Sequence, residues 1–180
     1  MNFCKNAIES IEPLSLYFYN ICYNISMQQR VYIDTSVIGG CFDEEFSLWS
    51  IKLFEDFQNG KKIAVISDLT KRELEFAPNE VKNVIASINE ANIENVFLTK
   101  DAEQLAWQYI KNNVVGKKHI VDAQHIAIAT IERVDILVSW NFKQIVNLDR
   151  IHAFNAINLM LGYPILEIRN PREVIYEKDI

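Results

Sequence analysis

Three acidic residues, far apart in the sequence, are the side chains best able to do chemistry in this chain: Asp34, Glu73 and Asp122. Grouped carboxylates suit hard cations such as Mg²⁺ and Mn²⁺, which take oxygen ligands and keep several of their waters. A cation held in this way can activate a water and stabilise charge on a scissile phosphate. Grouping also predicts a raised pKa for at least one of the acids without metal, because like charges disfavour each other. The three acids therefore indicate metal-assisted phosphate chemistry, provided that the fold brings them together.

Each acid has an ordinary structural interpretation as well. Asp34 directly follows the apolar run of residues 31–33, and an aspartate after a strand is often only the N-cap of the next helix. Glu73, taken alone, is typical of a solvated helix acid. Asp122 opens a helix that is otherwise apolar nearly all round, where the helix dipole stabilises an acid by about 0.3–1 kcal/mol. If all three acids lie at one edge of a sheet, metal binding becomes the favoured interpretation over these structural roles.

The histidines and the cysteine of this region carry weaker signals. His125 lies three residues after Asp122, but we expect it to be a core or boundary histidine bonded to the backbone. His119 and His152 show no partner at a telling spacing. Cys41 has no base at a telling spacing either, so the sequence does not support nucleophilic catalysis.

The elements that must position the acids follow from alternating apolar runs and helical periodicities. Runs rich in apolar and β-branched residues predict strands at residues 31–33, 62–66, 96–98, 136–138 and 165–168. Three- and four-residue spacings of apolar side chains predict helices within residues 46–57, 67–76, 78–88, 99–110, 119–133 and 148–161. This alternation predicts an α/β fold, in which a mostly parallel sheet has helices on both faces.

The first predicted strand gives Asp34 a specific place in such a fold. If that strand is central and parallel, Asp34 lies at its carboxyl end, where open α/β sheets bind their ligands. Gly39 and Gly40 predict a turn or loop a few residues later. Ser67 and Asp68 are possible N-caps of the helix that follows the second strand, and Thr99 is the predicted N-cap of the helix that follows the third.

Size, charge and cysteine content place further bounds on the protein. A chain of 180 residues suits one domain with a substantial core, and a net charge of −6 argues weakly against broad attraction to nucleic acid or anionic membrane. The basic pairs Lys71-Arg72 and Lys117-Lys118 flank two of the acids and could meet a phosphate backbone, although such pairs are usually solvated. Three cysteines without a C-x-x-C spacing favour a cytoplasmic protein with reduced thiols.

The first 26 residues differ in composition from the rest. Their densest apolar stretch, residues 14–25, is too short to span a bilayer and lacks the features of a signal peptide. We therefore expect residues 1–26 to be an N-terminal extension that is not native to the domain, and residues 27–180 to form that domain, starting at Met27. The alternative is an amphipathic helix that packs on the domain surface.

Four segments of the sequence together resemble the motifs of the PIN-domain nucleases, and within them the VapC-like bacterial toxins. The segments are residues 31–36, 66–73, 121–127 and 137–142, within a resemblance that covers about residues 29–174. The first three contain Asp34, Glu73 and Asp122, which match the metal-binding acids of the family. The fourth contains Ser139, and it has Asn141 where the family commonly has an acid. This departure puts the binding of two metals in doubt, because an amide carries no charge.

The resemblance implies a three-layer α/β/α sandwich and RNA cleavage that depends on Mg²⁺ or Mn²⁺. In it Asp34 and Asp122 are the principal metal ligands, and Glu73 binds the same metal or one of its waters. Ser139 and Asn141 orient water or substrate. Many relatives are dimeric toxins that a small antitoxin protein neutralises, so an antitoxin partner and a homodimer are implied, and no membrane. Hydroxyl contacts are expected from two further residues, Thr35 and Ser36.

Two other functions compete with this interpretation. A degenerate PIN-like domain would bind RNA or a protein partner without cutting, and Asn141 and the net charge of −6 favour it. A phosphoryl-transfer enzyme or receiver domain would use Asp34 as its nucleophile. That third function is disfavoured, because Asp34 lacks both a D-x-D partner and a preceding acidic pair.

Overall fold

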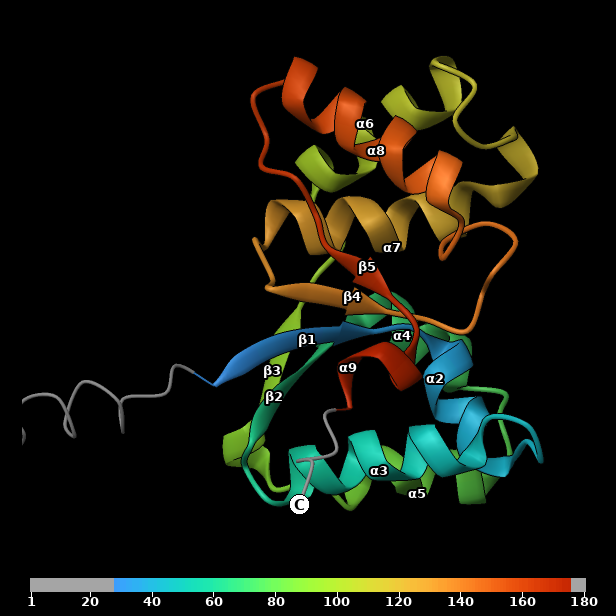
Figure 1. The fold of residues 1–180 in the computed structure, drawn as a ribbon, viewed down its shortest axis with the longest axis vertical. Coiled ribbons are helices and arrows are strands. Elements are labelled where there is room, and N and C mark those ends of the chain that lie inside the picture. The colour runs from blue at the N-terminus through green and yellow to red at the C-terminus, as the bar shows by residue number, and fades with distance from the viewer. Residues whose placement is uncertain (1–27, 176–180) are drawn as a thin grey trace, which may run out of the picture.

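A five-stranded parallel sheet forms the centre of the protein, of which the computed structural model describes residues 28–175 (Figure 1). The strands are β1 (Gln29–Ile33), β2 (Lys62–Ser67), β3 (Ile93–Val96), β4 (Ile136–Val138) and β5 (Ile168–Arg169). All neighbouring strands are parallel, in the order β3-β2-β1-β4-β5, so β1 is the central strand. The expected N-terminal extension, residues 1–26, lies outside the described residues.

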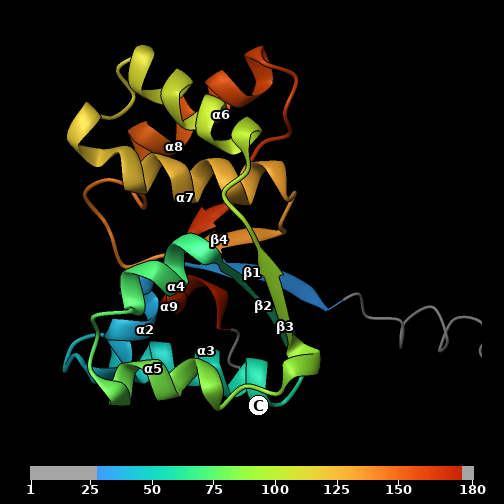
Figure 2. The ribbon, with the colours of Figure 1, turned by 180° about the vertical axis from the view of Figure 1, so that it is seen from behind.

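Helices cover both faces of this sheet. They are α2 (Thr35–Gly39), α3 (Ser47–Gln58), α4 (Asp68–Leu74), α5 (Asn79–Ala86), α6 (Lys100–Lys111), α7 (Ile120–Ile131), α8 (Leu148–Met160) and α9 (Pro171–Val174), with the short 3-10 helices η1 (Gly40–Phe42), η2 (Glu90–Asn92) and η3 (Lys117–His119). Figures 1 and 2 show α6, α7 and α8 on one side of the sheet and α3 and α5 on the other. The predicted α/β class and three-layer α/β/α sandwich are confirmed. No helix within residues 28–175 is long and apolar enough to cross a bilayer.

Two hydrophobic cores lie on the two faces of the sheet, and β1 contributes to both. Tyr32 packs into the core formed with α6, α7 and α8. Val31 and Ile33 pack into the core formed with α3. Successive side chains of a strand point to opposite faces of the sheet. Because both faces are covered, all three side chains are fully buried. Burial on both faces agrees with the uninterrupted apolar run at residues 31–33 of this strand.

The third strand begins and ends earlier than the sequence suggested. It covers residues 93–96, and the prediction of a strand at 96–98 is wrong beyond its first residue. Phe97 is 64% exposed, and the amide of Leu98 donates to the carboxylate of Asp68 at 2.8 Å. This bond ties the end of β3 to the start of α4.

The last strand and the glycine pair also differ from prediction. The strand is reduced from residues 165–168 to Ile168–Arg169, because Ile165 is exposed instead of packed. Gly39 and Gly40 do not form a loop. Gly39 ends α2 and Gly40 begins η1, both with right-handed helical φ angles near −60°.

The helices that follow β1, β2 and β3 (α2, α4 and α6) each begin with a side-chain N-cap. Ser67 and Thr99 are confirmed as N-caps, because the Ser67 hydroxyl accepts a bond from the Thr70 amide and the Thr99 hydroxyl accepts one from the Ala102 amide. Asp68 is the first residue of α4 and not its cap. Asp34 caps α2 similarly. The start of each helix is therefore fixed at the carboxyl edge of the sheet.

Candidate active site at the carboxyl edge of the sheet

Asp34 lies at the carboxyl end of the central strand and is almost completely buried, with 4% of its surface exposed. One carboxylate oxygen accepts a bond from the Ser36 hydroxyl at 2.6 Å and a longer one from the Val37 amide at 3.3 Å. The other oxygen accepts from the Ser139 hydroxyl at 2.7 Å. The helix-cap and strand-end interpretations of Asp34 are therefore both correct.

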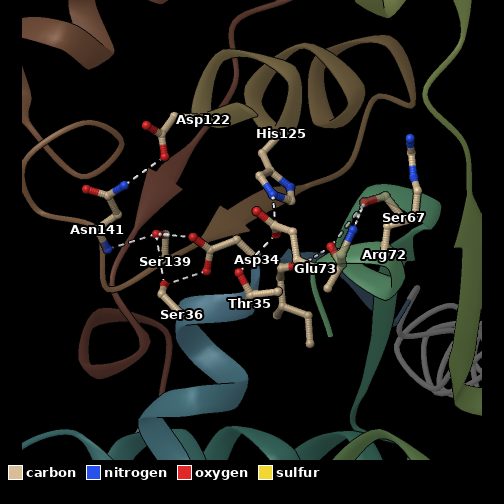
Figure 3. Close-up of polar contacts among 12 residues, drawn as sticks. Asp34, Thr35, Ser36, Ser67, Arg72, Glu73, Asp122, His125, Ser139 and Asn141 are labelled. Carbon is tan, nitrogen blue, oxygen red and sulfur yellow. Dashed lines mark hydrogen bonds and ion pairs between the residues drawn. The ribbon is translucent and has the colours of Figure 1, made fainter. Parts of the chain in front are cut away.

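Ser139 and Asn141 follow β4 and connect Asp34 to Asp122 (Figure 3). The backbone N–H of Asn141 donates to Ser139 Oγ at 2.9 Å, and the side-chain Nδ2 of Asn141 donates to Asp122 Oδ1 at 2.9 Å. Ser139 in turn donates to Asp34. Two acids that are 88 positions apart (122 minus 34) thus belong to one chain of hydrogen bonds.

Asp122 occupies the first turn of α7, as its position in the sequence predicted. Its second oxygen, Oδ2, lies 3.1 Å from Nδ1 of His119, and 22% of its side chain is exposed. The expectation that His119 has no partner is wrong, since it meets Asp122 at a spacing of three residues. Residues three apart share a face of a helical turn, so this spacing was the signal in the sequence.

Glu73, on α4, lies at the same edge of the sheet and is held by two partners. Thr35 Oγ1 donates to its Oε2 at 3.0 Å, and Nε2 of His125 lies 3.1 Å from the same oxygen. About a third of the Glu73 side chain is exposed, whereas only 3% of His125 is. Because an ionised carboxylate can only accept, this contact requires a proton on Nε2 of His125.

His125 joins Glu73 to the interior of the domain. Its Nδ1 lies 2.7 Å from the Tyr32 hydroxyl, which lies 2.8 Å from Ser67 Oγ. His125 is buried as expected, but its partners are side chains, and the prediction of a backbone partner is wrong. The contacts join α7 to β1, β2 and α4, which no spacing in the sequence discloses.

The pKa values of the three acids divide according to burial and partner. Burial raises the pKa of Asp34, against the lowering effects of His125 and of the hydrogen bonds from two serines. Burial also raises the pKa of Asp122, against the effect of His119. Burial acts to raise the pKa of Glu73 too, but the hydrogen bond and charge of His125 outweigh it, and that pKa is lowered. The prediction that at least one of the acids has a raised pKa is correct. The main cause is desolvation of Asp34 and Asp122, and repulsion between the carboxylates contributes little.

The residues fit a hard cation in chemistry but are not gathered around one point. All three are oxygen donors, and within residues 28–175 none of them is ion-paired to a lysine or an arginine. A buried carboxylate whose hydrogen-bond donors are all neutral, such as Asp34, is costly and would be stabilised by a cation. However, no group of three or more His, Cys, Asp and Glu side chains in this part of the chain is arranged to hold a metal ion. Metal binding by Asp34, Glu73 and Asp122 therefore stays a prediction.

Three residues of the basic pairs that flank these acids have partners outside the site. Arg72 pairs with Asp68 at 3.1 Å, and Lys71 donates to the Asn95 side chain at 2.6 Å. Lys117 lies over the ring of Trp107. In these positions the pairs belong to the surface, which is the ordinary interpretation of such pairs.

Comparison with known proteins finds similarity in structure. No protein-family model and no curated protein matches the sequence. The structure of FitAcB from Neisseria gonorrhoeae is 14% identical with a TM-score of 0.50, and the match covers 80% of this chain and 99% of that one. A sarcin-ricin loop cleaving toxin, VapC20 of Mycobacterium tuberculosis, is 13% identical with a TM-score of 0.49, over 63% and 91% of the two chains. DNA-bound VapBC from Salmonella typhimurium is 15% identical with a TM-score of 0.49, over 80% and 99%.

These likenesses concern the fold. At an identity of 14%, the FitAcB structure supports a common architecture, and it does not transfer an activity. The chain has the α/β fold that the resemblance to the PIN domain predicted. Its function depends on the residues of the site.

Proposed function

We propose that this protein is a divalent-metal-dependent endoribonuclease. The observation that carries the proposal is the position of Asp34, a buried carboxylate at the end of the central strand that has no lysine or arginine partner within residues 28–175. Asp122 and Glu73 lie at the same edge of the sheet, and the four sequence motifs supply the nuclease interpretation. This edge is where open parallel sheets bind their ligands.

The residues would divide the work between binding the metal and positioning the substrate. Asp34, Glu73 and Asp122 would hold Mg²⁺ or Mn²⁺, which supplies stabilisation of charge on the scissile phosphate and activation of a water. Ser139 keeps the Asp34 carboxylate in place through its 2.7 Å hydrogen bond. Asn141 holds Asp122 and offers its carbonyl oxygen to a water or to the substrate, since its amide group already donates to Asp122.

The histidine beside Glu73 has a role that follows from its contacts. Its hydrogen bond and charge help to lower the pKa of Glu73, so the carboxylate is kept ionised at neutral pH. An ionised carboxylate is the form that binds a cation. His125 would therefore act by positioning Glu73 rather than by touching RNA.

The proposed biological role is that of the toxin in a toxin-antitoxin pair, in the cytoplasm. The motif resemblance supports it, and it brings with it a small antitoxin partner and a homodimer. A short reading frame next to the gene, encoding a protein that binds this chain and blocks cleavage, is the expected finding. A gene without such a neighbour would contradict the toxin role and would leave the proposed ribonuclease activity untouched.

The activity is tested by Asp122→Asn, which keeps the shape of the side chain and removes its charge. We expect RNA cleavage to fall at least about a hundredfold, which corresponds to about 2.7 kcal/mol of transition-state stabilisation, and a chelator to abolish cleavage by the unmutated protein. Asp101→Asn is the matched control, because Asp101 is an exposed acid in the first turn of another helix, α6. Cleavage that survives both the chelator and Asp122→Asn would exclude the metal mechanism.

A non-catalytic PIN-like domain is the second candidate function. Two observations favour it: Asn141 replaces an acid, and the three carboxylates are bound to separate neighbours. Asn141→Asp separates the candidates, since a nuclease should keep its activity or gain some. A protein that binds RNA, retains metal and cleaves no RNA tested, with either residue at position 141, would be the non-catalytic domain.

A further inference from the structure

The segment that follows β4 has two different faces. Ser139 and Asn141 turn toward the carboxylates, to which they donate hydrogen bonds. Trp140 and Phe142, the alternate residues, turn the other way and contact each other with ring centroids 5.9 Å apart. Adjacent residues are about 3.8 Å apart along the chain, so the backbone of this one segment borders both the candidate active site and the second face.

On that second face lies a cavity of about 320 Å³, here called the aromatic pocket. Its aromatic lining residues are Phe46, Trp49, Trp140 and Phe142. Phe46 stacks on Trp140 with ring centroids 4.4 Å apart and an angle of 20° between the planes. Phe142 is 47% exposed, and Phe46 and Trp49 are partly exposed, so aromatic surface is left open to a ligand.

The rim of the aromatic pocket is polar and carries both charges. The guanidinium of Arg172 lies 5.6 Å from the centroid of the Trp49 ring. Glu45 lies on the rim as well, and its carboxylate can accept a hydrogen bond from an amino group. Asn170 completes the lining, but its side chain already caps α9 in a mutual bond with Glu173. A ligand with a flat ring and polar edges would match this lining.

We propose that the aromatic pocket binds one base of single-stranded RNA, in the nucleotide next to the scissile phosphate. The inference rests on the proposed ribonuclease function and adds to it a site that selects the substrate. Bases stack on aromatic side chains and on guanidinium planes, and only unpaired bases expose their faces for this. The position of the pocket, one residue along the chain from Ser139 and Asn141, suits a neighbouring nucleotide of the same strand.

The stacking can be tested without cleavage, because a nucleoside monophosphate contains no phosphodiester bond to cut. The four 5′-nucleoside monophosphates are titrated into the full chain, and the indole N–H signal of Trp140 is followed by NMR. Ribose 5-phosphate is the comparison ligand, since it has the charge but no base. We expect at least one nucleotide to shift the Trp140 signal and ribose 5-phosphate to leave it in place.

Phe142→Ala is the variant that removes the exposed ring, and it should fold because Phe142 is about half exposed. We expect it to weaken nucleotide binding about 5- to 150-fold and to lower kcat/KM for RNA by a similar factor, mainly through KM. Phe142→Tyr should restore both. Phe76→Ala is the matched control, since Phe76 is 94% exposed and lies outside this pocket, and it should change neither.

The outcomes distinguish this inference from the proposed activity. If the protein cleaves no RNA, but nucleotides bind and Phe142→Ala weakens their binding, the base-binding role of the pocket is supported and the nuclease activity is not. If the protein cleaves RNA, no nucleotide shifts Trp140 and Phe142→Ala behaves like Phe76→Ala, the inference is overturned while the activity stands. The inference would also be overturned if a protein partner covered the aromatic pocket and no nucleotide bound there.

Discussion

The inner and outer parts of the carboxylate site differ in what surrounds the acids. In the inner part, Asp34 is buried and its partners are the neutral hydroxyls of Ser36 and Ser139 and a backbone amide. In the outer part, Glu73 is half-buried and its main partner is the imidazole of His125. The pKa of Asp34 is raised and that of Glu73 is lowered, although both lie at one edge of the sheet.

This difference shows that position on the sheet does not by itself set the charge of a carboxylate. The charge of His125 and the neutral hydrogen-bond donors compensate Asp34 only in part, so burial decides its pKa. A histidine compensates Glu73 by both charge and hydrogen bond, so burial is outweighed. The inner acid therefore has most to gain from a bound cation, and the outer acid is already stabilised by the protein.

The largest effect is expected from Asp34→Asn, which tests the inner part. The asparagine keeps an acceptor oxygen for Ser36 and Val37, and its amide can donate to Ser139. RNA cleavage should fall at least about a hundredfold, because the charge that binds the cation is lost. Thermal unfolding in chelator should show unchanged or higher stability, since a buried charge has been removed. Glu73→Gln should instead lower stability by about 1 kcal/mol, and equal losses of stability in both variants would refute the contrast.

The next largest effect is expected from His125→Leu, which tests the outer part. The change removes the partner of Glu73 and that of the buried Tyr32 hydroxyl. A buried polar group that loses its partner costs about 1–3 kcal/mol, which urea unfolding would measure. His119→Leu is the matched control and should cost less, because His119 and Asp122 are both partly exposed. Equal costs would mean that the network through Tyr32 adds nothing.

The support of the inner part is tested by Gly40→Ala. A Cβ at this position would lie 2.6 Å from Ser50 Oγ and 2.7 Å from Trp140 Nε1, two atoms that hydrogen-bond to each other at 2.9 Å. The crowding should destabilise the protein by about 1–3 kcal/mol and lower cleavage, because Trp140 lies between Ser139 and Asn141. Gly39→Ala meets no atom within 4 Å and should be neutral or stabilising by about 0.5–1 kcal/mol. Thermal unfolding of the two variants measures both effects.

The smallest effect is expected in the pH dependence of stability without metal. Asp34 keeps its proton to a higher pH when folded than its ordinary pKa of 3.8, so its contribution to stability falls as the pH rises from about 3.8 through the folded pKa. Glu73 behaves in the opposite way. Its contribution is complete above its ordinary pKa of 4.5 and is lost as the pH falls through the lower folded value.

Urea unfolding between about pH 3 and pH 7, in chelator, would measure the two contributions. Asp34→Asn should flatten the decline toward neutral pH, and Glu73→Gln should flatten the decline toward acid pH. Variants that leave both slopes unchanged would show that other groups set the pH dependence. Mg²⁺ should reduce the decline toward neutral pH in the unmutated protein, if it binds ionised Asp34.

The sequence was sufficient for the alternation of strands with the longer helices along the chain and for the caps that begin several helices, but it did not predict α2 or α9. The apolar run before Asp34 predicted a buried strand, and Ser67 and Thr99 predicted N-caps, because these signals depend on neighbours in the chain. The ends of the third and last strands were wrong. Whether Phe97 or Ile165 packs against a core depends on elements elsewhere in the fold, to which local propensity is blind.

Only the tertiary structure decided how the candidate site is built. The contact of His125 with Glu73 spans 52 residues, and that of Ser139 with Asp34 spans 105. The same holds for the aromatic pocket, which draws residues from α3, the segment after β4 and α9. The sequence by itself named the acids and the edge of the sheet where they lie. Which of them is buried, which is paired and which way its pKa moves depend on distance and solvent exclusion, and these exist only once the chain has folded.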